Sequence, residues 1–194
     1  MPILRAFIAI ALDAETRQAV SGVQQRLKRL PGAPHVKWVA PDSLHLTLKF
    51  IGDLDSRRAP EVLQAVRHAC AGARPFQLTL HGLGAFPDLQ RPNVVWAGVG
   101  DRAGTAVRLA HRLEDECAAL GMAREDRPFS PHLTLGRVRR EASPAERQAV
   151  GEGVRSVQAA EIGRFDVEAV YLLRSDLRPD GAVYLELGRV PLEE

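Results

Sequence analysis

Cysteine is scarce in this sequence, and lysine is nearly as scarce. Cys70 and Cys117 are the two cysteines, too few for a disulfide framework and without the spacing of a metal site. Both lie in segments with helical periodicity, so we expect both side chains to pack as small buried hydrophobic groups. The lack of disulfides predicts a reducing cytoplasm as the compartment. Arginine supplies 23 of the 26 basic residues, yet the net charge is only +2. The overall charge therefore gives no indication of nucleic-acid binding, although a local basic pocket remains compatible with it.

Long hydrophobic runs are also missing. No stretch approaches the roughly 18 apolar residues that a membrane span requires. The apolar start at residues 3–12 is short, contains Arg5 and leads into acidic residues, so it predicts a buried strand rather than a signal peptide. A glycine-rich phosphate loop is absent, and no histidine or carboxylate pair has zinc or iron spacing. We therefore expect neither a cofactor nor a metal.

Hydrophobic periodicity predicts strands interspersed with helices. Helices are expected from Asp13, from Asp55 or Ser56, over 104–120 and from Ser143. Strands are expected at 3–12, 36–40, 43–51, 76–83, 93–99, at 132 onward, 165–173 and 182–187, the last two joined by a turn at 179–181. Several strands run in hairpin-like pairs, which favours an α+β fold over a doubly wound one. No linker divides the chain, so one domain over residues 1–194 is expected.

One tetrapeptide, HLTL, occurs twice, at residues 45–48 and 132–135. On a strand, His and Thr point to one face and the two Leu residues point to the other. A single copy is compatible with an ordinary strand. A repeat that keeps the polar pair in the same register is harder to explain by packing alone, because packing constrains only the apolar positions.

Two imidazoles and two hydroxyls around one cleft suit phosphodiester chemistry without a metal. One neutral histidine takes a proton from the attacking oxygen, and a protonated one gives a proton to the leaving oxygen. Thr47 and Thr134 can donate hydrogen bonds to the non-bridging phosphate oxygens. From the residues alone, either His45 or His132 can be the acid.

The residues that flank the two copies differ. Lys49 stands four residues after His45 and by alternation shares its face, which makes it a candidate for phosphate contact. The second copy has Gly136 there, and Arg137 falls on the opposite face unless a bulge intervenes at the glycine. Arg127, upstream of the second copy, is therefore the predicted cation of that half. For Lys49 and Arg127 the alternative is a solvated surface charge.

Other histidines and aromatics are weaker candidates. The histidines without a matching partner are His35, His68, His81 and His111. The aromatics near the repeated blocks are Phe7, Trp38, Trp96 and Phe129. Core packing is the expected role of these four aromatics, and stacking on a terminal base is the alternative for one of them.

With these blocks the sequence resembles the two-histidine (2H) phosphoesterase superfamily, and within it the RNA 2′,3′-cyclic phosphodiesterases, formerly named 2′-5′ RNA ligases. The resemblance rests on both HxTx motifs and on their flanks, in family order along nearly the whole chain. The matching blocks are RAFIAIAL, WVAPDSLHLTLKFIG, LGAFPDLQRPNVVWAGV, RPFSPHLTLGR and VYLLRSDLRPDGAVYLEL.

The resemblance implies a two-lobed α+β fold with a pseudo-twofold axis, in which antiparallel sheets flanked by helices each bring one HxTx strand to a central cleft. It implies metal-independent opening of a 2′,3′-cyclic phosphate at an RNA end to a 2′-phosphomonoester. It also implies that His45 is the proton donor, that His132 is the proton acceptor, and that Thr47 and Thr134 hold the phosphate. Some relatives join or cleave 2′-5′ linked RNA halves by the same chemistry.

Two alternatives remain open at this point. The same site can serve a small cyclic nucleotide or a cyclic phosphate of ADP-ribose, or the chain can be an RNA-end binding module without turnover. We expect a monomer, because no large unexplained apolar stripe remains. RNA ends are the partner that the resemblance implies, and no membrane partner is expected.

Overall fold

The structure, a computed structural model, describes residues 2–178 and 181–193. The helices in these ranges are α1 (Ala14–Leu27), α2 (Ala59–Cys70), α3 (Thr105–Ala119) and α4 (Pro144–Ser156). The strands are β1 (Ile3–Ala11), β2 (Val36–Trp38), β3 (His45–Asp55), β4 (Phe76–Phe86), β5 (Val94–Gly100), β6 (His132–Val138), β7 (Gly163–Val167), β8 (Ala169–Arg178) and β9 (Gly181–Pro191). Short 3-10 turns lie at Ala33–His35, Pro41–Ser43 and Ser56–Arg58.

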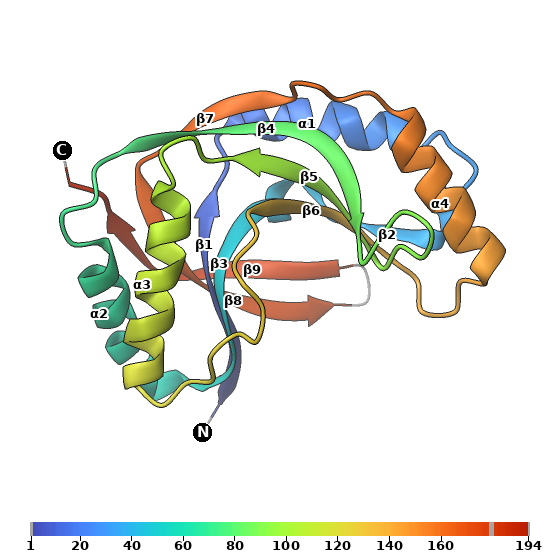
Figure 1. The fold of residues 1–194 in the computed structure, drawn as a ribbon. Helices are drawn as coiled ribbons and strands as arrows, with labels where there is room; N and C mark the ends of the chain where they lie inside the picture. Colours follow the sequence, from blue (N-terminus) through green and yellow to red (C-terminus); the bar gives the residue numbers. More distant parts are fainter. Residues whose placement is uncertain (1, 179–180, 194) are drawn as a thin grey trace.

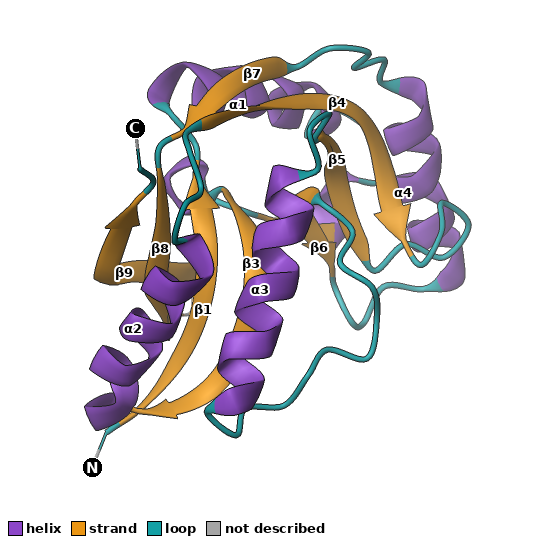
Figure 2. Ribbon diagram, turned by 60° about the vertical axis from the view of Figure 1, so that its left-hand side comes forward, coloured by secondary structure: helices purple, strands orange, loops and turns teal. Residues whose placement is uncertain are grey.

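Two antiparallel sheets form the framework (Figure 1). One has the strand order β3-β1-β8-β9, and the other has the order β2-β6-β5-β4-β7. Helices α2 and α3 lie against the four-stranded sheet, as Figure 2 shows for β1 and β3, while α1 and α4 lie against the five-stranded sheet. The predicted α+β class is confirmed, and the two HLTL copies begin β3 and β6, one in each sheet.

Helix caps follow the sequence signals closely. The Asp13 side chain accepts a hydrogen bond from the Thr16 amide, and Ser143 forms a reciprocal capping box with Glu146. The expected start at Asp55 or Ser56 differs: Asp55 accepts from the Arg57 amide in the 3-10 turn, and α2 begins only at Ala59. The caps at Asp13 and Ser143 fix where α1 and α4 begin.

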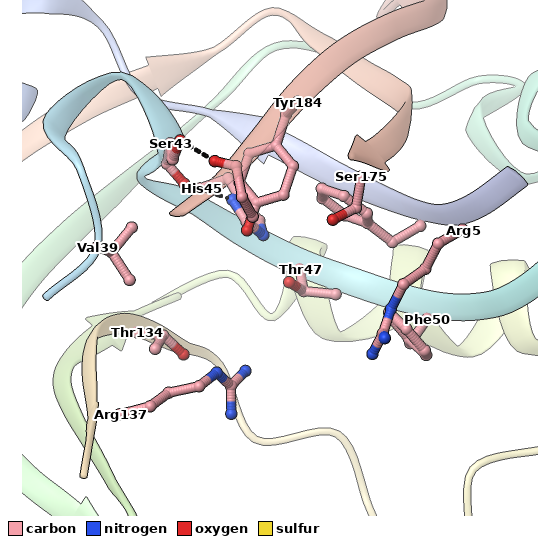
Figure 3. A pocket seen from close by; sticks show the side chains of 12 residues that line it. Arg5, Val39, Ser43, His45, Thr47, Phe50, Thr134, Arg137, Ser175 and Tyr184 are labelled. Carbon is pink, nitrogen blue, oxygen red and sulfur yellow. Dashed lines mark hydrogen bonds between the residues drawn. The ribbon is translucent and has the colours of Figure 1, made fainter. Parts of the chain in front are cut away.

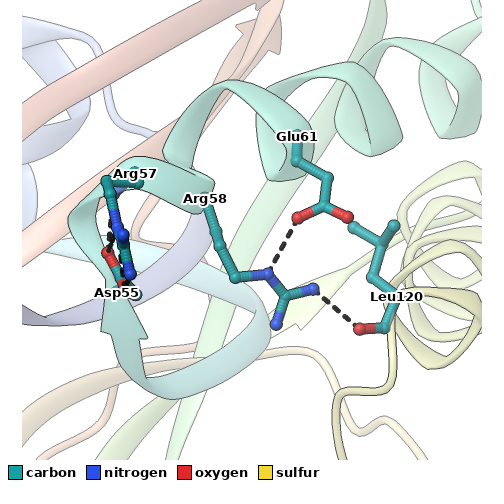
Figure 4. Close-up of polar contacts among 5 residues, drawn as sticks. All are labelled: Asp55, Arg57, Arg58, Glu61 and Leu120. Carbon is teal, nitrogen blue, oxygen red and sulfur yellow. Dashed lines mark hydrogen bonds and ion pairs between the residues drawn. The ribbon is translucent and has the colours of Figure 1, made fainter.

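The junction before α2 also reaches the end of α3 (Figure 4). The Arg58 guanidinium donates to Glu61 and to the Leu120 carbonyl at 2.8 Å each. Beside it, the hydrogen bonds from Arg57 lower the pKa of Asp55 to about 2. The residue that follows α3 is therefore tied to the base of α2.

The strand expected at 165–173 is in fact two strands in two different sheets. Residues 163–167 pair with β4 in the five-stranded sheet, while residues 169–178 pair with β1 and β9 in the four-stranded sheet. Glu168 lies between them, and apolar alternation continues through it, so the sequence pattern does not reveal the switch. The turn expected at 179–181 lies partly outside the described residues.

The leucines of both HLTL copies are buried in the core. Leu46 and Leu48 are 1% and 5% exposed, and Leu133 and Leu135 are 1% and 0% exposed. The His and Thr of each copy are only half-buried, so the predicted division of faces is confirmed. Within the described residues, no helix is long and apolar enough to cross a membrane.

Candidate active site

A pocket of about 190 Å³ lies where β3 and β6 face each other across the two sheets (Figure 3). Five strands and two loop positions supply its walls. The lining residues are Arg5, Phe7, Val39, Ser43, His45, Thr47, Phe50, Thr134, Arg137, Ser175, Ala182 and Tyr184. The pocket therefore combines residues from both HLTL strands, which are far apart in the sequence.

The two histidines are held in the same way. His45 Nδ1 lies 2.8 Å from the Ser43 carbonyl oxygen, and His132 Nδ1 lies 2.7 Å from the Ser130 carbonyl oxygen. A carbonyl oxygen can only accept, so each Nδ1 carries the hydrogen and donates it. In the neutral ring Nε2 is then the free acceptor, and in the protonated ring it is a donor. Each imidazole is thus oriented to exchange a proton through Nε2.

Aromatic rings surround the two histidines unequally. His45 contacts Phe7 at 4.7 Å and Tyr184 at 4.9 Å between ring centroids, whereas His132 contacts Phe86 edge-on at 4.9 Å. Burial lowers the pKa of His45 from its usual value, and the nearby Arg137 charge lowers it further, against the opposing effect of the Ser43 carbonyl. Free His45 therefore favours the neutral form.

The two threonines line the pocket from two different strands. Thr47 comes from β3 and Thr134 from β6, and both line the same space, as Figure 3 shows. His132 is not among the lining residues; it stands two positions before Thr134, on the same face of β6 by strand alternation. The structure thus brings His45, Thr47 and Thr134 together in one pocket. His132 lies outside the lining, two residues before Thr134 on β6.

Lys49 does not reach the pocket, and the prediction that it shares the His45 face is wrong. In the pairing of β3 with β1, Ala9 opposes Thr47 and Ile8 opposes Lys49, so Leu48 has no partner and forms a bulge. A bulge shifts the side chains that follow it to the opposite face. Lys49 is consequently 2% exposed and donates to Glu114 on α3 at 2.8 Å.

The same bulge occurs in the second copy and brings Arg137 into the pocket. Trp96 opposes Thr134 and Val95 opposes Gly136, which leaves Leu135 without a partner. Its carbonyl accepts from the Val39 amide and from the buried side chain of Gln24, both at 2.9 Å. Arg137 therefore does lie on the histidine face, as expected if a bulge intervenes, and the bulge is one residue before Gly136.

Arg127 lies elsewhere. It lines a separate hollow with residues of α3 and with its neighbours Asp126 and Phe129, away from Thr134. Arg5 and Arg137 are instead the cationic side chains in the described pocket wall, and sequence reasoning missed Arg5 because it lies inside an apolar strand. Of the aromatics considered for base stacking, Phe7 lines the pocket; Phe50 and Tyr184 were not foreseen. None of the four unmatched histidines is in that lining.

The sequence profile described as "LigT like Phosphoesterase" matches residues 10–96 and 99–184. The chain belongs to this family. The RNA 2′,3′-cyclic phosphodiesterase of Methanothermobacter thermautotrophicus is 36% identical over 184 residues, covering 95% of this chain and 96% of the relative. The protein of the same name from Archaeoglobus fulgidus is 33% identical, with coverage of 95% and 98%.

Two solved structures have the same fold. TT0787 of Thermus thermophilus is 30% identical with a TM-score of 0.78, over 97% of both chains. E. coli LigT complexed with 3′-AMP is 26% identical with a TM-score of 0.78, over all of both chains.

Proposed function

We propose that this chain hydrolyses 2′,3′-cyclic phosphates at RNA ends to 2′-phosphomonoesters, without a metal, as one catalytic unit over residues 1–194. The observation that carries the proposal is the matched pair of imidazoles, each fixed through Nδ1 by a carbonyl two residues upstream. The names of the relatives and the 3′-AMP complex of E. coli LigT support RNA as the substrate class.

In the proposed reaction a water molecule attacks the cyclic phosphorus. His132 Nε2 takes a proton from this water, the bond from phosphorus to the 3′ oxygen breaks, and His45 Nε2 gives a proton to that oxygen. The product carries a 2′-phosphate and a free 3′ hydroxyl. The assignment of acid and base follows the family resemblance.

The low pKa of His45 has to be reconciled with its proposed role as the acid. A bound cyclic phosphate is an anion, and an anion beside an imidazole favours the protonated form. It also offsets the Arg137 charge that disfavours protonation. We propose that binding of the anionic substrate raises the pKa of His45 and so favours its protonated form.

The remaining pocket residues have supporting roles in this proposal. Thr47 and Thr134 donate hydrogen bonds to the non-bridging oxygens, and Arg5 and Arg137 balance their charge. These arginines replace Lys49 and Arg127 of the sequence prediction. The aromatic walls suit the sugar and base of the terminal nucleotide. A cytoplasmic location and a monomeric state stay predictions.

The test is incubation of the EDTA-treated protein with a short RNA ending in a 2′,3′-cyclic phosphate, with products separated against 2′- and 3′-phosphate standards. A 2′-phosphate product is expected, reduced about 10²- to 10⁴-fold in His45→Ala and in His132→Ala. Loss of turnover in EDTA, or turnover that survives both substitutions, would contradict the proposal.

Further arms separate the alternatives. A small cyclic nucleotide and a cyclic phosphate of ADP-ribose are offered in competition with the RNA, and the preferred substrate is the one hydrolysed first. An RNA acceptor with free ribose hydroxyls tests joining, since a 2′-5′ linked product migrates as a longer chain. Tight RNA binding without any product would indicate a binding module.

A further inference from the structure

Lys49 is a buried charge, and the proposed reaction does not use it directly. Its side chain is 1% exposed, and its ammonium donates to Glu114 Oε1 at 2.8 Å and to the Ala123 carbonyl at 2.7 Å. A buried ammonium is costly unless it is paired and hydrogen-bonded. Both partners lie outside β3, so this side chain links the first HLTL strand to two other parts of the chain.

Those parts converge on one segment. Glu114 Oε1 also accepts the Glu125 amide at 2.9 Å, so Lys49 and Glu114 together hold residues 123 and 125. Residues 120–131 connect α3 to β6 without a helix or strand of their own (Figure 1). The end of this segment contains Ser130, whose carbonyl anchors His132. A network built on the buried Lys49 thus holds the segment that orients the second histidine.

We propose that Lys49 and Glu114 are positioning residues that fix His132 relative to His45. The two histidines belong to different sheets, and Lys49 lies four residues after His45 on β3. The network joins that strand to the approach of the other histidine. A kinetic test of this inference rests on the proposed function. An NMR test of the histidine positions rests on the geometry alone.

A purely stabilising role predicts a different result. Replacement of a buried ion pair by apolar residues of similar volume is often neutral or stabilising. The double variant Lys49→Met/Glu114→Leu removes both charges together and leaves neither one unpaired. Ala123 and Glu125 are exposed residues, so water can replace their lost hydrogen bonds. This variant separates folding from positioning.

The molecule offers a matched control. Arg124 and Asp115 form an ion pair at 2.8 Å between the same segment and the same helix, but both side chains are largely exposed. An exposed pair contributes little to geometry or stability. Arg124→Gln should therefore leave turnover and the histidine signals unchanged. Glu114→Gln keeps an acceptor oxygen and is the conservative variant.

The experiment measures Tm, kcat, KM and the imidazole ¹⁵N and Nδ1–H NMR signals of both histidines. With Tm near wild type, the double variant is expected to lose kcat about 10- to 100-fold, as misplaced catalytic groups do, with KM within about threefold. The Nδ1–H signal of His132 should broaden or shift while that of His45 stays. Glu114→Gln should retain most of kcat.

A folded double variant with wild-type kcat and an unchanged His132 signal would overturn the inference. If the double variant does not fold, Lys49→Met alone decides, because it removes the Ala123 bond and leaves the Glu114 bond to Glu125; unchanged kcat and an unchanged His132 signal there would also overturn it. If the wild type itself shows no turnover, the proposed function fails, while the comparison of His132 with His45 by NMR still tests positioning.

Discussion

The two HLTL strands have one backbone geometry and two different sets of side chains. In both, the imidazole is anchored by the carbonyl two residues upstream, the second leucine forms a bulge, and the fifth residue after the histidine turns to the pocket. That fifth residue is Phe50 in β3 and Arg137 in β6. The fourth is a buried lysine in one strand and a glycine in the other. The repeated geometry therefore anchors both imidazoles in the same way, while the flanking residues place different side chains in the pocket.

Among the positions at which the two strands differ, the largest effect is expected at the fifth. Arg137→Gln removes a cation from the pocket wall, and hydrogen bonds to charged groups contribute about 1.5–3 kcal/mol, so kcat/KM should fall about 10- to 100-fold. Arg127→Gln is the control, because Arg127 lies outside the pocket. Steady-state kinetics with cyclic-phosphate RNA measure both. Equal losses in the two variants would contradict the assignment.

The fourth position gives the next largest effect, on stability. A Cβ at Gly136 would lie 2.5 Å from Val36 Cγ1 and 3.1 Å from Trp38 Cε3, so β6 cannot accept even a methyl group without movement. Gly136→Ala should lower the free energy of unfolding by about 1–3 kcal/mol.

The control for Gly136→Ala is Gly22→Ala in α1. Gly22 has nothing within 4 Å of the added Cβ, and alanine favours a helix by about 0.5–1 kcal/mol, so stability should rise. Urea unfolding measures both variants. A tolerated Gly136→Ala would mean that the absence of a side chain here is incidental.

The smallest effect concerns the unequal surroundings of the two histidines. Because the folded pKa of His45 is below the usual value of about 6.5, the folded state binds its proton less readily than the unfolded state does. The His45 contribution to unfolding free energy should therefore rise with pH from the folded pKa up to about 6.5. Arg137→Gln removes one cause, so the His45 pKa should rise toward the usual value.

NMR titration of the imidazole signals checks this directly. A His45 pKa at or above about 6.5 in the free protein would contradict the effect of burial. An unchanged His45 pKa in Arg137→Gln would assign the whole effect to burial and none to the neighbouring charge.

Sequence reasoning placed the side chains of the two HLTL copies better than it placed the contacts around them. Strand alternation is enough to place His45 and Thr47 on one face and the leucines on the other. Alternation fails one residue later, because a bulge depends on hydrogen bonds made by distant groups such as Gln24, which lies 111 positions from Leu135. Arg137 was assigned to the wrong side for this reason, and Lys49 was misplaced because of the matching bulge at Leu48.

The fold was predictable at the level of its class and most of its elements. Caps such as Asp13 and Ser143 are local signals, and both correctly predicted the start of a helix. The change of sheet at Glu168 is not local: one apolar pattern runs through two strands that pair with β4 and with β1. Arg5 was missed for a related reason, since an arginine in an apolar run gives no sign that a pocket faces it.

That change of sheet has a consequence for biosynthesis. β1 and β3 are made before β8, which pairs with β1 from Ala6 to Ala9 but begins only at Ala169. Ser175 of β8 and Tyr184 of β9, which close one side of the pocket, are made after Ala169 as well. A chain still attached to the ribosome therefore holds both HLTL motifs long before it can complete the sheet beneath the first. Nascent chains that end before Ala169, and chains truncated there, should therefore lack a complete pocket.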